Sequence, residues 1–396
     1  MSQVEFIALC AMMFATIAFS IDAMLPALPE IAAELSPGNL NQATLIITSF
    51  VMGMGLGTFF TGPLSDRFGR KVVLISGAAL YSLCAFIGWY SQTLEWVLAA
   101  RLVMGIGAAG PRIVTLAIVR DLFEGREMAR IMSFSMMIFT LVPAVAPLMG
   151  QFIIDFSSWR GIFIAFMLFS LISVLWIGIR LPEPLARENR RAFSLAKLWG
   201  GAREMWAIPA VRTSMLVQTM IFASLFALIS SVQPIYDQTY GRAEEFPVWF
   251  AVIALISGSA SFLNARLVMR LGMRYLVTLA LGMQVLVGLG MIMATGIETL
   301  DTQFYAFAVW QLTGFFFVGM TIGNLNALAM EPLGHMAGTA ASVMGAFSTI
   351  LGGLLATPIA LLFDGTALPL AASVTVLYAL SFGLMLRMRR LETITA

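Results

Sequence analysis

The sequence has few charged side chains, and this scarcity decides its class. Only 11% of the 396 residues are Asp, Glu, Lys or Arg, against about 25% in soluble proteins. Hydrophobic residues make up 60% of the chain, and the mean hydropathy is +0.91. Because a water-soluble fold cannot bury this much apolar surface, we expect an all-α integral membrane protein.

Cysteine and histidine are almost absent. The two cysteines, Cys10 and Cys84, lie in apolar runs, and His335 is the only histidine. This pattern predicts neither a disulfide framework nor a metal site. The sequence also contains no phosphate-binding loop and no nucleophile–base pair. We therefore expect no enzyme activity, no cofactor, no metal and no nucleic-acid partner.

Apolar runs of about 20 residues, the length that spans a bilayer, occur twelve times. The start, MSQVEF, lacks the basic region of a cleaved signal peptide, so we expect the first run to be retained. One long polar interval divides the runs six and six. We predict an N-terminal half over 1–180, a cytoplasmic linker over 181–208 and a C-terminal half over 209–396. Part of the linker is either an amphipathic helix on the inner leaflet or an ordinary solvated segment.

Positive charge is distributed unequally between the two sides of this topology. The loops after the even-numbered runs, together with the linker and the C-terminal tail, hold 19 of the 23 Lys and Arg residues. The opposite loops hold two, Arg160 and Arg242. Cytoplasmic loops are enriched in Lys and Arg, so this split predicts that both termini are cytoplasmic.

The two halves show a weak internal repeat. GPLSDRFGRK (62–71) follows the second run, and ARLVMRLGMR (265–274) follows the eighth. Two basic positions and one glycine coincide, while the position of Asp66 is occupied by Met269. Duplicated six-helix halves are typical of transporters with a central site between the repeats.

Four stretches resemble a known family. GPLSDRFGRK resembles the loop signature of the major facilitator superfamily, and RLVMGIGAA (101–109) resembles its fourth-helix signature. PAVAPLMGQ (143–151) is similar to the proline–glycine antiporter signature, with two substitutions. IDAMLPALPEI (21–31) is similar to the first-helix motif of twelve-helix drug:proton antiporters, most of all the bicyclomycin and chloramphenicol exporters (Bcr/CflA-like). The resemblance implies a major facilitator fold of two six-helix halves.

Asp22 is the only charged residue between Phe6 and Pro29. The 16 residues before it, Phe6 to Ile21, make about 24 Å of helix, which is shorter than a hydrocarbon core of about 30 Å. The span must therefore include Asp22. An acid at this depth faces a cavity or a partner, and it gains or loses a proton when its surroundings change. The alternative is a capping or salt-bridging acid at the outer interface.

Two arginines lie in the fourth run. Arg101 is expected in the outer half, as Asp22 is, and the resemblance implies that it couples protonation to transport. We predict that the two side chains interact in one conformation and separate in the other, or else form a static ion pair. Arg112 lies three helical turns further on, after Pro111. It either faces the cavity, where it would attract anionic substrates, or extends to the inner interface.

The loop signature predicts an inner gate formed by Gly62, Asp66, Arg67, Gly69, Arg70 and Asp121. Asp66 and Arg70 are spaced i, i+4 across a turn that we expect Gly62 and Gly69 to permit. The resemblance implies that Asp66 docks on the N-terminus of helix 11 and that Arg70 reaches Asp121. The alternative is a basic loop that only sets topology.

Further polar or helix-distorting residues lie inside the apolar runs. In the fifth run these are Pro143, Pro147 and Gly150. They form either a bend that seals the interface between the halves against proton leak or an ordinary kink. The resemblance implies that the seventh and tenth helices face the cavity, so the expected cavity residues of the C-terminal half are Gln218, Gln233, Gln311 and Asn324.

The sequence therefore predicts a monomeric, proton-coupled antiporter of the bacterial inner membrane that exports drugs or drug-like small molecules. Two alternatives on the same fold stay open: export of an endogenous metabolite or siderophore, and uptake by proton symport.

Overall fold

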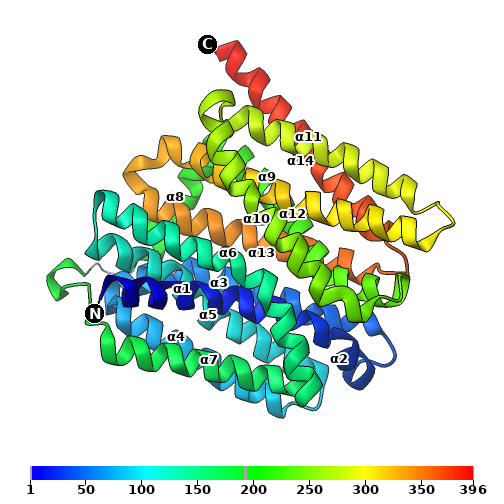
Figure 1. Cartoon of the computed structure of the whole chain (residues 1–396). Coiled ribbons are helices and arrows are strands. Elements are labelled where there is room, and N and C mark those ends of the chain that lie inside the picture. The colour runs from blue at the N-terminus through cyan, green and yellow to red at the C-terminus, as the bar shows by residue number, and fades with distance from the viewer. Residues whose placement is uncertain (1, 191–193, 396) are drawn as a thin grey trace. The chain divides into compact units, whose positions relative to one another are not determined.

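The computed structural model describes residues 2–190 and 194–395, and within these ranges the chain is helical without any strand (Figure 1). It divides into two compact units, Met1–Ala196 and Lys197–Ala396. The division falls inside the interval 181–208, whose assignment as a cytoplasmic linker stays a prediction. Each unit is described by itself below.

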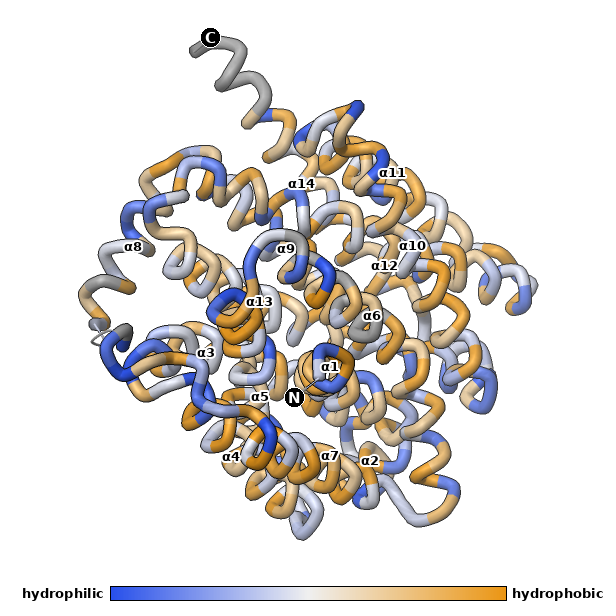
Figure 2. The backbone as a smooth tube through the Cα atoms, turned by 60° about the vertical axis from the view of Figure 1, so that its left-hand side comes forward, coloured by the Kyte–Doolittle hydropathy of each residue, from blue (hydrophilic) through white to orange (hydrophobic). Residues whose placement is uncertain are grey.

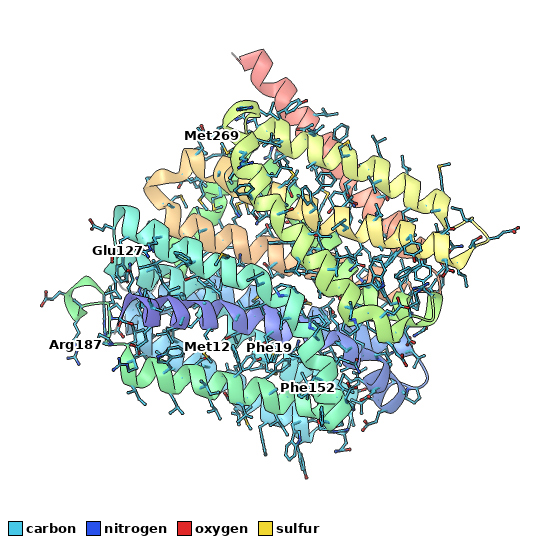
Figure 3. All side chains as sticks on the ribbon, viewed as in Figure 1. Met12, Phe19, Glu127, Phe152, Arg187 and Met269 are labelled. Atoms are coloured by element: carbon cyan, nitrogen blue, oxygen red, sulfur yellow. The ribbon has the colours of Figure 1, made fainter. Side chains whose placement is uncertain are left out.

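The first unit begins with a helix that is broken at Asp22. Its helices and short turns are α1 (Gln3–Asp22), η1 (Leu25–Ala27), α2 (Leu28–Leu35), η2 (Leu40–Thr44), α3 (Leu45–Phe68), α4 (Arg70–Tyr90), α5 (Leu94–Leu122), α6 (Gly125–Phe156), α7 (Trp159–Arg180) and η3 (Arg187–Asn189). Helix α8 (Leu195–Ala207) crosses into the second unit. Figure 3 shows Glu127 and Arg187 near one end of the first unit, and Met12 and Phe19 along α1.

Helices α3 and α5 pack at backbone distance. A Cβ atom on Gly105 would overlap the carbonyl oxygen of Phe50, and one on Gly53 would overlap that of Leu102. Inside a membrane the hydrophobic effect does not drive helices together, so association depends on close van der Waals contact, which small residues permit. This pair forms the most extensive helix contact of the first unit.

The second unit contains the remaining helices. They are α9 (Pro209–Pro234), the π-helical turn η4 (Ile235–Thr239), η5 (Ala243–Glu245), α10 (Phe246–Leu271), α11 (Met273–Ala294), α12 (Leu300–Met330), η6 (Glu331–Met336), α13 (Ala337–Leu361) and α14 (Leu368–Thr395). Helix α9 packs on α12, α13 and α14, while α11 packs between α12 and α14.

Ten helical segments of the described chain are long and apolar enough to cross a membrane. One of them, Leu300–Leu361, contains both α12 and α13, and a shorter apolar stretch, Leu141–Phe156, lies in α6. Hydrophobic residues run along the helices, and hydrophilic ones gather at the helix ends and connections (Figure 2). Large apolar side chains are exposed, among them Phe152 at 63% and Leu286 at 64%, as expected of a surface that faces lipid.

We predict that Gly105→Ala lowers the melting temperature of the detergent-purified protein by several degrees. The new methyl group forces α3 and α5 apart, which costs about 1–3 kcal/mol. Gly178→Ala in α7 is the matched control, because nothing lies within 4 Å of its Cβ position. Equal melting temperatures for the two variants would contradict the close packing of α3 on α5.

Candidate functional site

Asp22 lies at the last residue of α1, and its side chain is buried, with 4% of the residue exposed. The helix ends here because Pro26 has no N–H to donate to the Asp22 carbonyl four residues earlier. The chain continues into η1 and then α2. The last carbonyl groups of α1 are therefore left without the usual helical donors.

Arg101, from the first third of α5, donates to one of these carbonyl groups. Its Nη2 donates to the carbonyl oxygen of Ser20 at 2.7 Å, and its Nε to that of Ile46 at 3.4 Å. The side chain is fully buried, and its guanidinium lies 4.4 Å from the ring centre of Phe50 and 5.6 Å from that of Phe166. A cation at a helix C-terminus is favoured by the helix dipole, and one over aromatic faces is stabilised further.

Asp22 and Arg101 are not joined in this structure. No hydrogen bond or ion pair connects the two side chains in the part of the chain that the structure describes. Arg101 instead holds the backbone two residues before Asp22, and its Nη1 has no hydrogen-bond partner. The predicted alternation between a paired and a separated state stays a prediction.

The sequence analysis missed Tyr81 and Ser20. The two hydroxyl oxygens lie 2.5 Å apart, and Ser20 donates to the carbonyl oxygen of Thr16, so the Tyr81 hydroxyl is the donor to Ser20. Tyr81 comes from α4 and is 2% exposed. Its only signal in the sequence is a hydroxyl group inside an apolar run, which does not identify a partner 61 residues away.

Gly150 of α6 packs directly on the broken end of α1. A Cβ at this position would overlap the carbonyl oxygen of Ala23, the residue after Asp22. Pro147 is also buried, whereas Pro143 is half-buried. The glycine of the fifth-run signature therefore lets α6 approach the backbone beside the acid.

Arg70 connects residues of the predicted inner gate. Its Nη1 lies 2.6 Å from Asp66 Oδ1, and its Nε lies 2.8 Å from Asp121 Oδ2. Only 6% of the Arg70 side chain is exposed, whereas 41% of Asp66 and 21% of Asp121 are, so a buried cation here binds two acids that solvent still reaches. Arg67 contacts the ring of Phe68, with 5.1 Å from its guanidinium to the ring centre.

The expected turn at 62–69 is wrong in one respect. Gly62 lies inside α3, which continues through Pro63 to Phe68. Gly69 alone makes the turn, with φ of +106°, a backbone conformation that favours glycine. Pro63 has no N–H to donate to the Phe59 carbonyl, so α3 lacks one hydrogen bond there and still continues to Phe68.

Glu183, beyond the end of α7, is a third residue that the sequence analysis missed. Its carboxylate accepts from the backbone N–H of Arg70 at 2.8 Å and of Lys71 at 3.1 Å. These are the first residues of α4, where the helix dipole favours an anion. Glu183 therefore connects the segment after α7 to the loop signature.

The remaining predicted residues do not form one hydrogen-bonded group. Arg112 is exposed on α5. In the second unit Gln311 accepts from the Tyr236 hydroxyl at 3.1 Å, and Asn324 donates to Asn264 at 2.7 Å. Each of these contacts joins two segments of the same unit. Two further glutamines of α9 are buried, and the side-chain oxygen of each has no hydrogen-bond partner: Gln218 and Gln233.

Comparison with known proteins decides the family. A family model described as the Major Facilitator Superfamily matches residues 7–357. The chain belongs to the Major Facilitator Superfamily. This membership confirms the predicted family and makes the protein a multi-pass membrane transporter of small molecules rather than an enzyme.

Relatives of this superfamily transporter include resistance proteins. It is 31% identical over 356 residues to a bicyclomycin resistance protein homolog of Haemophilus influenzae, covering 89% of this chain and 88% of that protein. It is 30% identical over 285 residues to the chloramphenicol resistance protein CraA of Acinetobacter baumannii, covering 69% and 63%. It is 28% identical over 333 residues to the multidrug resistance protein MdtL of Escherichia coli, covering 82% and 80%.

Solved structures share the fold at much lower identity. A D-xylose–proton symporter matches with a TM-score of 0.77 at 13% identity, covering 97% of each chain. The human organic anion transporter MFSD10 matches with a TM-score of 0.67 at 16% identity, covering 97% of this chain and 100% of that one. These likenesses support the all-helical major facilitator fold.

We predict that Glu183→Ala lowers the unfolding free energy by about 1–3 kcal/mol, because two backbone N–H groups of α4 lose their acceptor. Thermal unfolding of the purified protein measures this change. Glu188→Ala, at an exposed position of η3, is the control and is expected to change stability by less than about 0.5 kcal/mol. A Glu183 variant as stable as the control would show that the contact contributes nothing.

Proposed function

We propose that this transporter is a proton-coupled antiporter that exports drugs or drug-like small molecules across the bacterial inner membrane. The observation that carries the proposal is the buried Asp22 at the broken end of α1, the same helix end whose Ser20 carbonyl binds the buried Arg101. The names of its relatives, which include bicyclomycin, chloramphenicol and multidrug resistance proteins, support the substrate class.

The proposed topology has twelve transmembrane helices in two halves of six, with both termini cytoplasmic. The ten apolar segments support it, because Leu300–Leu361 contains two helices and α6 contains a further apolar stretch. The excess of Lys and Arg on one set of loops supports the orientation. A single chain with two halves is sufficient for this design, so we propose a monomer.

Asp22 is proposed as the proton carrier and Arg101 as its coupling partner. A carboxyl group changes its proton occupancy when it moves between an apolar site and one that is hydrated or paired with a cation. Arg101 holds the α1 carbonyl at Ser20 in this structure and has one N–H-bearing atom, Nη1, without a partner. A small shift of the α1 end toward Nη1 would bring carboxylate and guanidinium together and release the proton.

The Arg70 cluster is proposed as part of the inner gate. Arg70 joins Asp66 and Asp121, from the ends of α3 and α5. Alternating access requires such contacts to form in one state and to open in the other. Docking of Asp66 on the N-terminus of the eleventh span, between the halves, is part of this proposal.

We predict that Asp22→Asn abolishes drug-driven proton movement while the protein still inserts in the membrane. The amide has the size of the acid but cannot exchange a proton. Everted vesicles carrying a pH-sensitive dye report proton release when chloramphenicol is added. Glu95→Gln, at an exposed position in the first turn of α5, is the control and is expected to behave as the unchanged protein.

If the Asp22→Asn variant released as many protons as the Glu95→Gln control, the proposed role of Asp22 would be wrong. Drug susceptibility of expressing cells, with and without an uncoupler, separates export from uptake. Export lowers susceptibility only while the proton gradient is present, whereas uptake by symport raises it.

We predict that Arg112→Ala weakens the apparent affinity for carboxylate-bearing substrates by about fivefold to thirtyfold, which is about 1–2 kcal/mol. Neutral substrates are expected to change little, because an exposed guanidinium attracts only the anion. Arg112→Lys, which keeps the charge, is the matched variant and should retain most of the affinity. Competition between labelled and unlabelled substrates in vesicles measures these values, and an equal effect on charged and neutral compounds would refute a role in substrate attraction.

A further inference from the structure

A small cavity lies inside the second unit where four helices meet. Helix α9 packs on α12 and α14, and α11 packs on the same two helices (Figure 1). All four helices line the cavity, which has a volume of about 10 Å³. A volume of about 10–15 Å³ is the smallest that holds one water molecule. Any larger ligand is therefore excluded by size.

Two buried polar side chains that line this cavity have no hydrogen-bond partner among the described residues. Gln284 of α11 is 1% exposed, and both its amide nitrogen and its amide oxygen are unpaired. Trp310 of α12 is also 1% exposed, and its indole N–H is unpaired. An unpaired polar group inside a membrane protein is strongly destabilising, because no bulk water reaches it. The amide and the indole therefore require a partner other than the side chains around them.

Gly314 of α12 leaves open the space in front of the amide. A Cβ atom on this glycine would lie 3.3 Å from Leu228 Cδ2 and 3.6 Å from Gln284 Nε2, so the amide faces the position that a side chain would fill. Ser224 of α9 lines the same cavity. Its hydroxyl donates to the carbonyl oxygen of Met220 at 2.9 Å, which leaves the Ser224 oxygen free to accept.

The first unit has a cavity of the same size between corresponding helices. Each of the two cavities, of about 10 Å³, is lined by the first, third, fourth and sixth of the six long helices of its unit. Gly107 lines the first cavity and Gly314 the second, 207 residues later. The hydroxyl groups that line the first cavity already donate to oxygen atoms of their own unit: Thr16, Tyr81, Ser170 and Ser173. The unpaired amide and indole groups therefore distinguish the second cavity.

We propose that the second cavity binds one water molecule, which completes the hydrogen bonds of Gln284 and Trp310. The water accepts from the Trp310 indole and bonds to the Gln284 amide and to the Ser224 oxygen. A buried water typically makes about three hydrogen bonds, and these three groups supply them. The residues that line the cavity are all uncharged, so they offer no counter-charge to a metal ion or an anion. One water thus links α9, α11 and α12, and the inference depends on the packing of the second unit and not on drug export.

X-ray radiolytic labelling of the full-length, detergent-purified protein tests the proposal. Hydroxyl radicals formed from a bound water oxidise the side chains beside it, even where these side chains are buried. Tyr378 of α14 lines the cavity and is only 3% exposed, so its oxidation reports water at this site. We expect mass spectrometry to find Tyr378 oxidised about tenfold faster than in Gly314→Ala, whose methyl group takes the volume of the one water that the cavity holds.

Gly323→Ala is the matched control in the same helix, because nothing lies within 4 Å of its Cβ position. This variant is expected to leave the oxidation rate of Tyr378 unchanged. The neighbours of the Gly314 Cβ position are the ends of two flexible side chains, so Gly314→Ala is expected to fold as the control does.

Gln284→Met distinguishes a hydrated site from a dry one by the sign of the change in melting temperature. Methionine has nearly the length of glutamine but lacks the amide. With a water in the cavity, the substitution removes one of its partners, and we expect the melting temperature to fall by several degrees. In a dry cavity the same substitution would remove an unpaired amide and raise the melting temperature.

Three results would overturn the proposal. The first is a Tyr378 side chain that stays unoxidised in the unchanged protein. The second is oxidation that Gly314→Ala does not slow. The third is a higher melting temperature for Gln284→Met. None of these measurements involves transport, so failure of the water site and failure of drug export are distinguishable.

Discussion

The burial of one guanidinium group is the constraint on which the first unit depends. A charged side chain inside a membrane helix bundle costs several kcal/mol unless it is paired or hydrogen-bonded. Arg101 meets this requirement with the Ser20 carbonyl and with two aromatic rings. That carbonyl is available because α1 ends two residues later. The break in α1 and the buried cation therefore stabilise each other.

The broken end of α1 is also where several helices meet. Arg101 reaches it from α5, Tyr81 from α4 through Ser20, and Gly150 from α6 against Ala23. Each contact involves the backbone or a short side chain at the end of α1, so this segment has little room to move without altering them. A displacement of this segment therefore changes all three contacts together.

The opposite end of the first unit is organised by a second buried arginine. Arg70 holds two acids, and its own backbone N–H is held by Glu183. Removing either acid leaves the buried Arg70 with less compensating charge, which is more costly than breaking a fully exposed pair. Glu183 joins the segment after α7 to the same group of residues.

The sequence by itself determined the membrane class, the family and the acid at the end of the first helix, because composition, apolar run length and the proline at position 26 act locally. It did not predict that Arg101 bonds to the α1 backbone, that Tyr81 reaches Ser20, or that Glu183 accepts from the start of α4. It also placed Gly62 in a turn that proved to be helix. These features join residues far apart in the chain, and several use backbone atoms that every residue carries. Only the tertiary structure decides such contacts, since a sequence pattern identifies a side chain but not the carbonyl or amide group that packing brings beside it.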